Sequence, residues 1–530
     1  MLTNRPIVSP LRRPWTSLAA AALLLLASQP VATQATDSDG DGLPDAWETQ
    51  FGLDPNSAVG ANGAQGDPDL DNQTNAVEFA AGTHPRGFYS EWFAEGATGV
   101  FFDERLALFN PDPTLTARAW VRFLPSNGAP ISVFMSVAPH QRLTVDPEQV
   151  AGLQNAAFSA VVESDVPLAV DRTMKWDARH YGSHTETGAP RPSSVWYLAE
   201  GATHSGFDLF YLFMNPNPTE VAVQVSYLLP SGAPIVKTYN VPAQSRFNVW
   251  VDNEDARLAA TDVSAVINSS APIVVERSMY LGTGGLQFGA GHTSMGVTAP
   301  ALTWFLAEGA TGDFFDLFVL VANPNTDAAN VEARYLLPSG TVVTKNYTVA
   351  PRSRFNIWVD LEDGQLASTS VSTTVTSTNN VPIIVERSMW WPGGGWQEAH
   401  NSPGTTSTAR RWALAEGEVG GADNSRTYVL IANTSSHSGQ ARVVLYFEDG
   451  SAATVNADLS ANSRFTLDVA ARVPQAAGKR FGAVVESSGP NPIDLVVERA
   501  VYSDAGGVTW AAGTNALAMP VIDGTISGTQ

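Results

Sequence analysis

The chain repeats itself four times, and this repetition constrains its fold more than any other feature. A segment that begins with tryptophan and ends in Ala-Glu-Gly opens each copy, at Trp92, Trp196, Trp304 and Trp412 of the 530 residues. These tryptophans are 104, 108 and 108 residues apart, which is the length of an independent β-sandwich domain. The sequence therefore predicts four similar domains in series, each with a hydrophobic core of its own.

Residues that alternate between apolar and polar inside each copy are typical of strands with one buried face. In the third copy this alternation covers residues 331–337, a Pro-Ser-Gly turn follows at 338–340, and a second strand runs to Val349. Shorter apolar stretches at 304, 317–322, 355–359, 371–375 and 383–389 complete about seven strands. Seven antiparallel strands per copy predict an immunoglobulin-like β-sandwich.

An acidic stretch precedes the repeats, and its carboxylates are regularly spaced. Its first loop has the spacing of an EF-hand, with ligands at positions 1, 3, 5, 7, 9 and 12 supplied by Asp37, Asp39, Asp41, the Leu43 carbonyl, Asp45 and Glu48. Gly42 stands at position 6, where the loop turns sharply. Ca²⁺ takes six to eight hard oxygen ligands, so this spacing predicts a calcium site.

A second copy of the loop begins thirty residues later. Its predicted ligands are Asp67, Asp69, Asp71, the Gln73 carbonyl, Asn75 and Glu78. Asn72 replaces the glycine at position 6; because Asn tolerates the left-handed conformation, we expect the turn to survive with some loss of affinity. A solvated acidic linker without bound ions is the alternative for both loops.

The last ligand of each loop falls on a predicted short helix, at 45–51 and at 74–81, and Gly52 and Gly82 are the stop signals. The run from Asp37 to Glu48 resembles the thrombospondin type 3-like calcium repeats of secreted bacterial proteins. The four later copies resemble an uncharacterised repeat family, also of secreted bacterial proteins, through their Ala-Glu-Gly opening and their Glu-Arg-Ser-Met closing strand. These resemblances imply calcium as the bound ion and an extracellular location, but no activity.

The first residues have the parts of an export signal: a basic leader at Arg12 and Arg13, an apolar run at 18–26 and small residues at Thr33 and Ala35. We place cleavage after Ala35, with an uncleaved anchor as the alternative, and expect no transmembrane anchor after cleavage. Predicted divisions are a signal peptide (1–35), a calcium-binding EF-hand-like segment (36–88) and four β-sandwich repeats (89–195, 196–303, 304–411 and 412–530). The predicted fold class is thus mainly β: four tandem immunoglobulin-like sandwiches behind a short loop-helix segment.

Composition excludes several functions. The chain has no cysteine and a formal net charge of −22. Disulfides and thiolate chemistry are therefore ruled out, and nucleic acid is an unfavourable partner because its binding depends on clustered Lys and Arg. Neither a zinc-protease motif nor a nucleophile-elbow motif occurs, and an active site is usually built once rather than four times. We therefore predict no enzyme activity.

Two repeated features carry alternative interpretations. An acidic-Arg pair closes each copy (171–172, 276–277, 386–387 and 498–499), and one member of each pair must face the packed side of its strand. We predict buried ion pairs in which Arg172, Arg277, Arg387 and Arg499 bind Glu95, Glu200, Glu308 and Glu416 of their own opening strands. Recognition of a ligand by the acidic-Arg pair is the alternative.

The loop after each closing strand is rich in aromatic residues. These are Trp176, His180, Tyr181, Tyr280, His292, Trp390, Trp391, Trp396, His400, Tyr502 and Trp510. Such side chains either pack between consecutive modules, which we favour, or stack on sugar rings.

From these features we expect a secreted or cell-surface calcium-binding protein of bacterial type. Four sandwiches in series predict an elongated structural or adhesive rod. A carbohydrate-binding array and an accessory chain of a secreted enzyme are the alternatives. A cell-surface or matrix glycan or protein is the partner that these alternatives imply.

Overall fold

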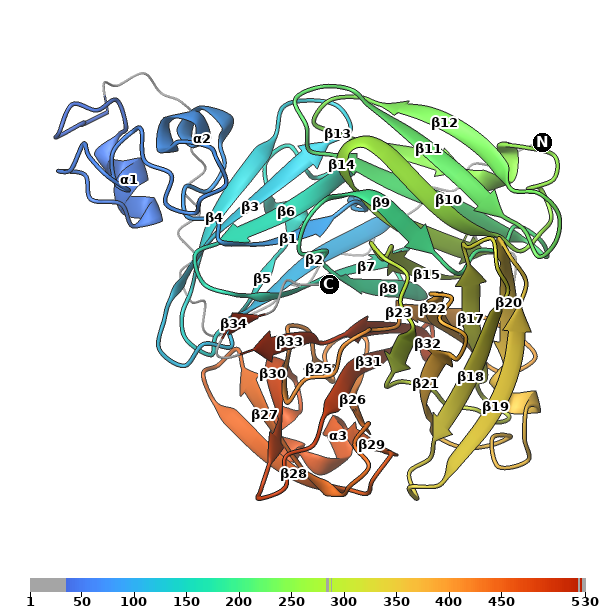
Figure 1. The fold of residues 1–530 in the computed structure, drawn as a ribbon. Helices are drawn as coiled ribbons and strands as arrows, with labels where there is room; N and C mark the ends of the chain where they lie inside the picture. The colour runs from blue at the N-terminus through green and yellow to red at the C-terminus, as the bar shows by residue number, and fades with distance from the viewer. Residues whose placement is uncertain (1–34, 283–285, 287, 523–524, 527–530) are drawn as a thin grey trace, which may run out of the picture.

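The computed structural model describes residues 35–282, 286, 288–522 and 525–526. The predicted signal peptide therefore lies, apart from Ala35, outside the described residues. Antiparallel sheets dominate the described chain, and they pair into four β-sandwiches, here numbered 1 to 4 from the N-terminus (Figure 1). The predicted fold class is confirmed.

Sandwich 1 shows the common plan. One sheet has the strand order β1-β6-β3-β4 and the other the order β5-β2-β7-β8. The strands are β1 (Tyr89–Phe93), β2 (Phe102–Phe109), β3 (Ala117–Pro125), β4 (Ile131–Val137), β5 (Arg142–Val145), β6 (Phe158–Ser164), β7 (Ala169–Trp176) and β8 (Gly182–Thr187).

Sandwich 2 follows this plan with one change, because the long strand β14 serves in both sheets. It therefore joins β12-β11-β14 and β14-β10-β13 into one seven-stranded assembly that also takes in β9 and β15. The strands are β9 (Ser193–Leu198), β10 (Phe207–Asn215), β11 (Val221–Leu228), β12 (Ile235–Val241), β13 (Ser245–Trp250), β14 (Ser264–Leu281) and β15 (Ala290–Met295).

Sandwich 3 returns to two separate sheets, in the orders β16-β21-β18-β19 and β20-β17-β22-β23. The strands are β16 (Thr303–Leu306), β17 (Asp316–Asn323), β18 (Ala329–Leu336), β19 (Val342–Val349), β20 (Ser353–Trp358), β21 (Ser372–Ser377), β22 (Ile384–Trp391) and β23 (Glu398–Pro403).

Sandwich 4 adds short strands and a one-turn helix, α3 (Val469–Arg472), to the same plan. Its sheets are β28-β27-β30-β24-β33-β34, with β25 beside β30, and β29-β26-β31-β32. The strands are β24 (Arg411–Leu414), β25 (Glu418–Val419), β26 (Arg426–Asn433), β27 (Gly439–Phe447), β28 (Ala452–Leu459), β29 (Ser463–Asp468), β30 (Lys479–Ser488), β31 (Leu495–Ala505), β32 (Val508–Leu517), β33 (Met519–Ile522) and β34 (Thr525–Ile526).

The opening tryptophan recurs because it anchors the core between the two sheets. Trp196, Trp304 and Trp412 are all at most 1% exposed. Each indole N–H donates to a backbone carbonyl near the start of the closing strand, at 2.8–3.0 Å. A buried indole needs such a partner, so one side chain both fills the core and ties the first strand to the closing one. Trp92 departs from the pattern, since its N–H donates to the hydroxyl of Ser90.

The prediction of about seven strands missed the last strand of the plan. β8, β23 and β32 lie in the aromatic-rich segments predicted to be loops, and each forms a hairpin with its closing strand. β15 pairs with the end of β14 in the same way. The four terminal strands pack side by side around a common axis in the order β8, β15, β23, β32 and back to β8 (Figure 1).

The prediction of an elongated rod is wrong, because sandwich 4 closes back onto sandwich 1. Phe109 of sandwich 1 stacks on Tyr446 of sandwich 4 with ring centroids 5.7 Å apart, and Lys175 forms a 2.6 Å salt bridge with Asp423. Serial repeats do not fix the angle between neighbours. The ring is favoured because it covers the outer edge of every terminal strand, which a rod would leave exposed.

Buried ion pairs run around the ring, each linking one closing strand to the next. Arg172 binds Glu276 at 2.8 Å, Arg277 binds Glu386 at 2.7 Å, and Arg387 binds Glu498 at 2.8 Å. Arg499 lies 3.5 Å from Asp171 and completes the cycle. The aspartate that sets the first repeat apart thus stands at the point of ring closure.

The pairs predicted within single sandwiches are present in only two of them. Arg172 lies 3.3 Å from Glu95, and Arg277 lies 3.2 Å from Glu200.

In sandwiches 3 and 4 the predicted pairing is wrong. Glu308 instead lies 3.5 Å from Arg464 of sandwich 4, and Glu416 pairs with Arg142 of sandwich 1. Neighbouring sandwiches approach so closely that an arginine from the next one competes for the same carboxylate.

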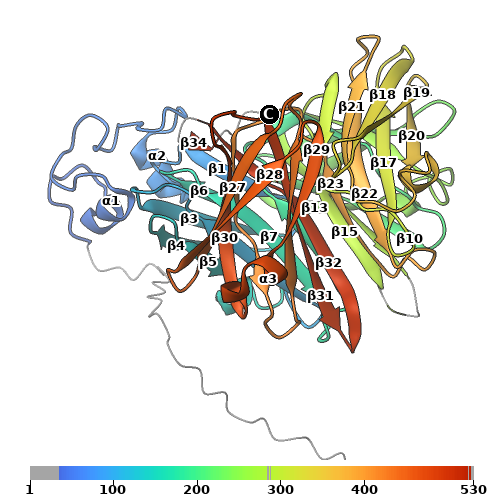
Figure 2. The same cartoon turned by 90° about the horizontal axis from the view of Figure 1, so that it is seen from below.

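The acidic segment forms a small unit of its own beside sandwich 1, with helices α1 (Asp45–Phe51) and α2 (Asn75–Ala81) (Figures 1 and 2). Both helices stop at the predicted glycines, Gly52 and Gly82, which adopt the left-handed conformation. Phe51 packs against Trp120 and Phe134 of sandwich 1, with ring centroids 5.4 and 6.0 Å apart. The unit therefore shares an aromatic contact with the ring.

Candidate calcium-binding unit

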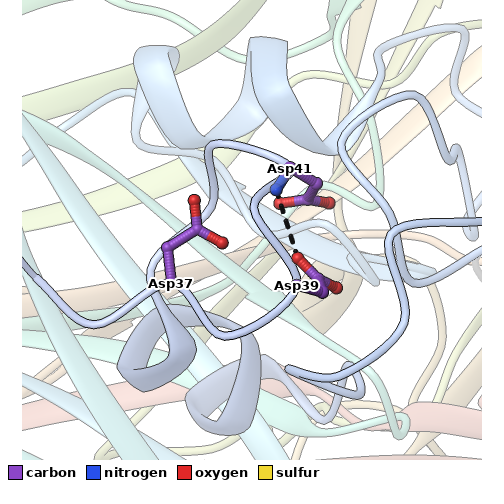
Figure 3. Close-up of side chains that lie close together, drawn as sticks. All are labelled: Asp37, Asp39 and Asp41. Carbon is purple, nitrogen blue, oxygen red and sulfur yellow. Dashed lines mark hydrogen bonds between the residues drawn. The ribbon is translucent and has the colours of Figure 1, made fainter.

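The first acidic loop brings three aspartates to one centre. A carboxylate oxygen from each of Asp37, Asp39 and Asp41 lies within 4.8 Å of the other two (Figure 3). The loop is shaped by its own backbone, since the N–H groups of Gly40 and Gly42 donate to Asp37 at 2.8 and 3.0 Å. Backbone N–H donors bend the chain around these carboxylates but leave their negative charges without a cation.

Glu48 is the residue of this loop that most clearly indicates a cation site. Helix α1 presents it to the loop, its side chain is fully buried, and neither carboxylate oxygen has a hydrogen-bond partner. Burial and the nearby Asp39 and Asp41 raise the pKa of Glu48 to about 7. A buried carboxylate with no partner is costly, so the site has the electrostatics of a cation site.

The two remaining predicted ligands of the first loop, Leu43 and Asp45, take part in hydrogen bonds, unlike the carboxylate of Glu48. Leu43 is buried, and its N–H donates to Asp41 at 2.9 Å. Asp45 accepts hydrogen bonds from both the N–H and the hydroxyl of Ser38, at 2.7 Å each. Asp45 therefore closes the entrance of the loop. An EF-hand often uses position 9 through a water, which agrees with a carboxylate that is already engaged.

The second loop repeats the arrangement. Oxygens of Asp67, Asp69 and Asp71 lie within 4.8 Å of one another, and Asn72 adopts a positive φ of 73° at the position of the missing glycine. Gln73 folds onto Asp71, with its N–H and side-chain amide donating at 2.7 and 2.8 Å.

The ligands at positions 9 and 12 of this loop are buried and only partly satisfied. The amide nitrogen of Asn75 donates to the carbonyls of Ala61 and Gly63, which leaves its Oδ1 without a partner. Glu78 has one free buried oxygen, and burial with the nearby Asp69 raises its pKa to about 8. Both loops thus contain buried oxygens that have no hydrogen-bond partner.

The chain between the loops links them into one unit, a feature that the sequence analysis did not find. The N–H of Ala64 donates to Asp41 of the first loop at 2.6 Å, and Asn75 of the second loop holds the same connecting segment. Trp47 of α1 packs edge-on against Phe79 of α2, with centroids 5.4 Å apart. No spacing rule marks Ala64, because it contributes only a backbone N–H.

The donor set fits calcium. Every predicted side-chain ligand is a carboxylate or a carboxamide, and Ca²⁺ prefers several such hard oxygens, whereas zinc prefers nitrogen and sulfur. Position 12 of each loop carries a buried glutamate, Glu48 or Glu78, the residue that binds Ca²⁺ with both oxygens in an EF-hand.

The aromatic residues after the closing strands lie mostly between sandwiches. Trp176 packs against Tyr280 of sandwich 2, and Trp391 packs against Tyr502 of sandwich 4, with centroids 5.5 and 5.3 Å apart. Trp390 packs against Phe207 of sandwich 2. The favoured interpretation, packing at module junctions, agrees with these contacts.

His292 and His400 belong to the terminal strands rather than to loops, and both are 1% exposed. His180 and Trp396 are half-buried and bind Asp423 and Asp316. Tyr181 and Trp510 are half-buried as well.

Comparisons with known proteins add little to the site. No family model and no curated protein matches this chain. Two solved structures match short parts of this chain: Thermotoga maritima 1070 (16% identity, 22% of this chain and 97% of that one, TM-score 0.19) and the Anabaena sensory rhodopsin transducer (23% identity, 16% of this chain and 92% of that one, TM-score 0.15). A tetra-tandem repeat from the extending region of a large adhesion protein matches at 12% identity over 79% of this chain and 94% of that one, with a TM-score of 0.10.

Among the described residues, no helix has the length and apolar character needed to cross a membrane.

Proposed function

We propose that this protein is a secreted, non-catalytic calcium-binding protein in which a ring of four sandwiches serves as a structural or adhesive scaffold. Its N-terminal unit would be ordered by two calcium ions, one in each acidic loop. The observation that carries the proposal is Glu48, a fully buried carboxylate with two unpartnered oxygens beside three aspartates. A divalent cation at that centre would remove the repulsion and the desolvation cost together.

An extracellular location agrees with this chemistry. The export signal predicted at 1–35 and the absence of cysteine are typical of an exported bacterial chain. Extracellular calcium modules bind with dissociation constants of about 10⁻⁴ to 10⁻³ M. Sites with the small departures found in the second loop would still be loaded where calcium is millimolar.

A scaffold without turnover agrees with how the ring uses its charged residues. The repeated Arg-acid pairs, which are the most regular polar groups of the chain, hold neighbouring sandwiches together. Trp390 and Trp391 are 4% and 1% exposed, so they are not free to stack on a glycan. The scaffold would therefore meet a cell-surface or matrix partner with other parts of its surface, as a compact ring.

Calorimetric titration of calcium into the chain from residue 36 tests the proposal. We expect two binding events, of which Glu48→Gln removes one and Glu78→Gln the other. Asp54→Asn is a matched control, since Asp54 lies in the same segment, outside both loops, and accepts hydrogen bonds from Asn56. No heat of binding at millimolar calcium, or equal losses from Asp54→Asn, would overturn the proposal.

A further inference from the structure

A cavity of about 150 Å³ lies at one end of the ring axis, where the chain leaves the four terminal strands. Residues from every sandwich line it, among them Thr187, Met295, Pro403 and Leu517. The lining is mostly apolar. A cavity formed jointly by four sandwiches exists only because the ring is closed.

Two carboxyl groups interrupt this apolar lining. Glu91 of β1 is 8% exposed, and its Oε2 is buried without a hydrogen-bond partner. Glu186 of β8 is 4% exposed and accepts hydrogen bonds from the N–H groups of Met295 and Thr187, at 2.6 and 3.0 Å. Within the described part of the chain, neither carboxyl forms a salt bridge. Arg191 also lines the cavity, but its side chain is exposed.

The ring fold does not require these two acids. Strand register places Glu91 at the same position as Val195, Thr303 and Arg411 of the other sandwiches. Glu186 faces the closing-strand arginine across its hairpin, where the other sandwiches have Ser294, Ser402 and Ala516. Acids at both positions occur in sandwich 1 alone, so the repeated architecture does not explain them.

We propose that this axial cavity binds a small organic cation, an ammonium group carried on an apolar body. The ammonium would bind Glu91, whose Oε2 has no hydrogen-bond partner, and the apolar body would contact residues of the same cavity such as Met295 and Leu517. Two carboxylates in an apolar cavity are costly without a counter-charge, and such a ligand would supply one. Two carboxyl groups are too few for Ca²⁺, which needs six to eight oxygens, so the cavity differs in kind from the N-terminal loops.

The electrostatics of both groups support this assignment. Burial and, to a smaller extent, the nearby Glu276 raise the pKa of Glu186 to about 8. Burial, followed by Asp171, raises the pKa of Glu91 well above its usual range. Among the described residues, Glu91 has no cationic neighbour that would keep its pKa low, and at Glu186 the lowering by Arg172 is smaller than the raising by burial and by Glu276.

Calorimetric titration with n-hexylammonium and with n-hexanol tests the proposal on the calcium-saturated mature chain. The two probes share an apolar body but differ in charge. We expect the amine to bind about 10- to 100-fold more tightly than the alcohol, the size of a charge-assisted hydrogen bond. Equal affinity for the two probes, or no binding of the amine, would overturn the proposal.

Two variants show where the amine binds. Glu91→Gln should fold, because the Glu91 carboxyl has no hydrogen bond to lose, and it should reduce amine affinity by about tenfold or more. Glu398→Gln is the control: Glu398, on the terminal strand β23, is a buried acid like Glu91, is held by the N–H groups of Gly291 and Ala399, and does not line this cavity. Equal loss in both variants would show that the amine does not bind at Glu91.

Discussion

Glutamates are buried both in the ring and in the N-terminal unit, but their surroundings differ. In the ring, Glu276, Glu386 and Glu498 each lie within 2.8 Å of an arginine from the preceding sandwich. In the N-terminal unit Glu48 is equally buried, yet its nearest charged neighbours are aspartates. These three glutamates thus have their counter-charges within the ring, whereas we propose that Glu48 takes its counter-charge from an ion in solution.

Because of this difference, we expect the ring and the N-terminal unit to differ in whether they need calcium in order to fold. The carboxylates that link the sandwiches already have arginine partners, so we expect the ring to be stable whether or not calcium is present. The unit should lose order in chelator, because its loops then hold like charges at close range. The four predictions below test this contrast.

The largest effect is expected from breaking one ring ion pair. Arg277→Met leaves Glu386 and Glu200 buried without their cation, which should lower the free energy of unfolding by about 3–5 kcal/mol. Denaturant unfolding with and without calcium measures this. Arg257→Met is the control, because Arg257 forms an exposed pair with Asp255 and should matter little. Equal stability of the two variants would show that the ring pairs are not essential.

In the N-terminal unit, removing a charge should have opposite consequences with and without calcium. Glu48→Gln should weaken calcium binding by at least about 10- to 100-fold, the loss seen when even an outer-shell partner of a metal is removed. In chelator the same variant should stabilise the unit, because it removes an unpartnered buried carboxylate. Thermal unfolding with calcium and in chelator shows whether the variant stabilises or destabilises the unit under each condition. Destabilisation in chelator would mean that Glu48 has a partner of its own.

Packing at ring closure offers a test that does not involve charge. A Cβ added at Gly482 would lie 2.3 Å from the ring of Phe109 in sandwich 1, so Gly482→Ala should cost about 1–3 kcal/mol. Phe109→Leu should recover part of this loss in the double variant. Gly364→Ala, at a position with open space, is the control. A neutral Gly482→Ala would mean that the junction between sandwiches 1 and 4 is loose in solution.

The smallest effect concerns the two loops. Asn72 adopts a left-handed conformation that Gly42 adopts in the first loop. Asn72→Gly should therefore tighten the second site by less than about 1 kcal/mol, and Gly42→Asn should weaken the first by a similar amount. The calcium affinity of each loop is measured by titration in a chain whose other loop carries its position-12 variant, Glu48→Gln or Glu78→Gln. Changes of the same sign would contradict the assumed equivalence of the loops.

The sequence predicted local structure well and the arrangement of modules poorly. Strand alternation located β18 within a few residues, and the glycines after α1 and α2 marked both helix ends. Periodicity and stop signals act within a few residues of the chain, so they can be read from it directly.

Ring closure has no local signal. Arg499 meets Asp171, and Arg142 meets Glu416, across distances in sequence that no spacing rule connects. The terminal strands were mistaken for loops because they are rich in His, Ser and Thr, as in β8 and β15, and lack an alternating apolar face. Their repeated His184, His292 and His400 were a usable signal, because all three stand at one position of the repeat.

Hydrogen exchange of the backbone amides, followed with and without a calcium chelator, would separate the two regions in one experiment. We expect chelation to remove protection from residues 36–88 and to leave the strands of the ring protected, including β8, β15, β23 and β32. Unchanged protection in residues 36–88 would contradict the view that the buried Glu48 and Glu78 depend on an ion. Loss of protection throughout the ring would contradict its independence from calcium.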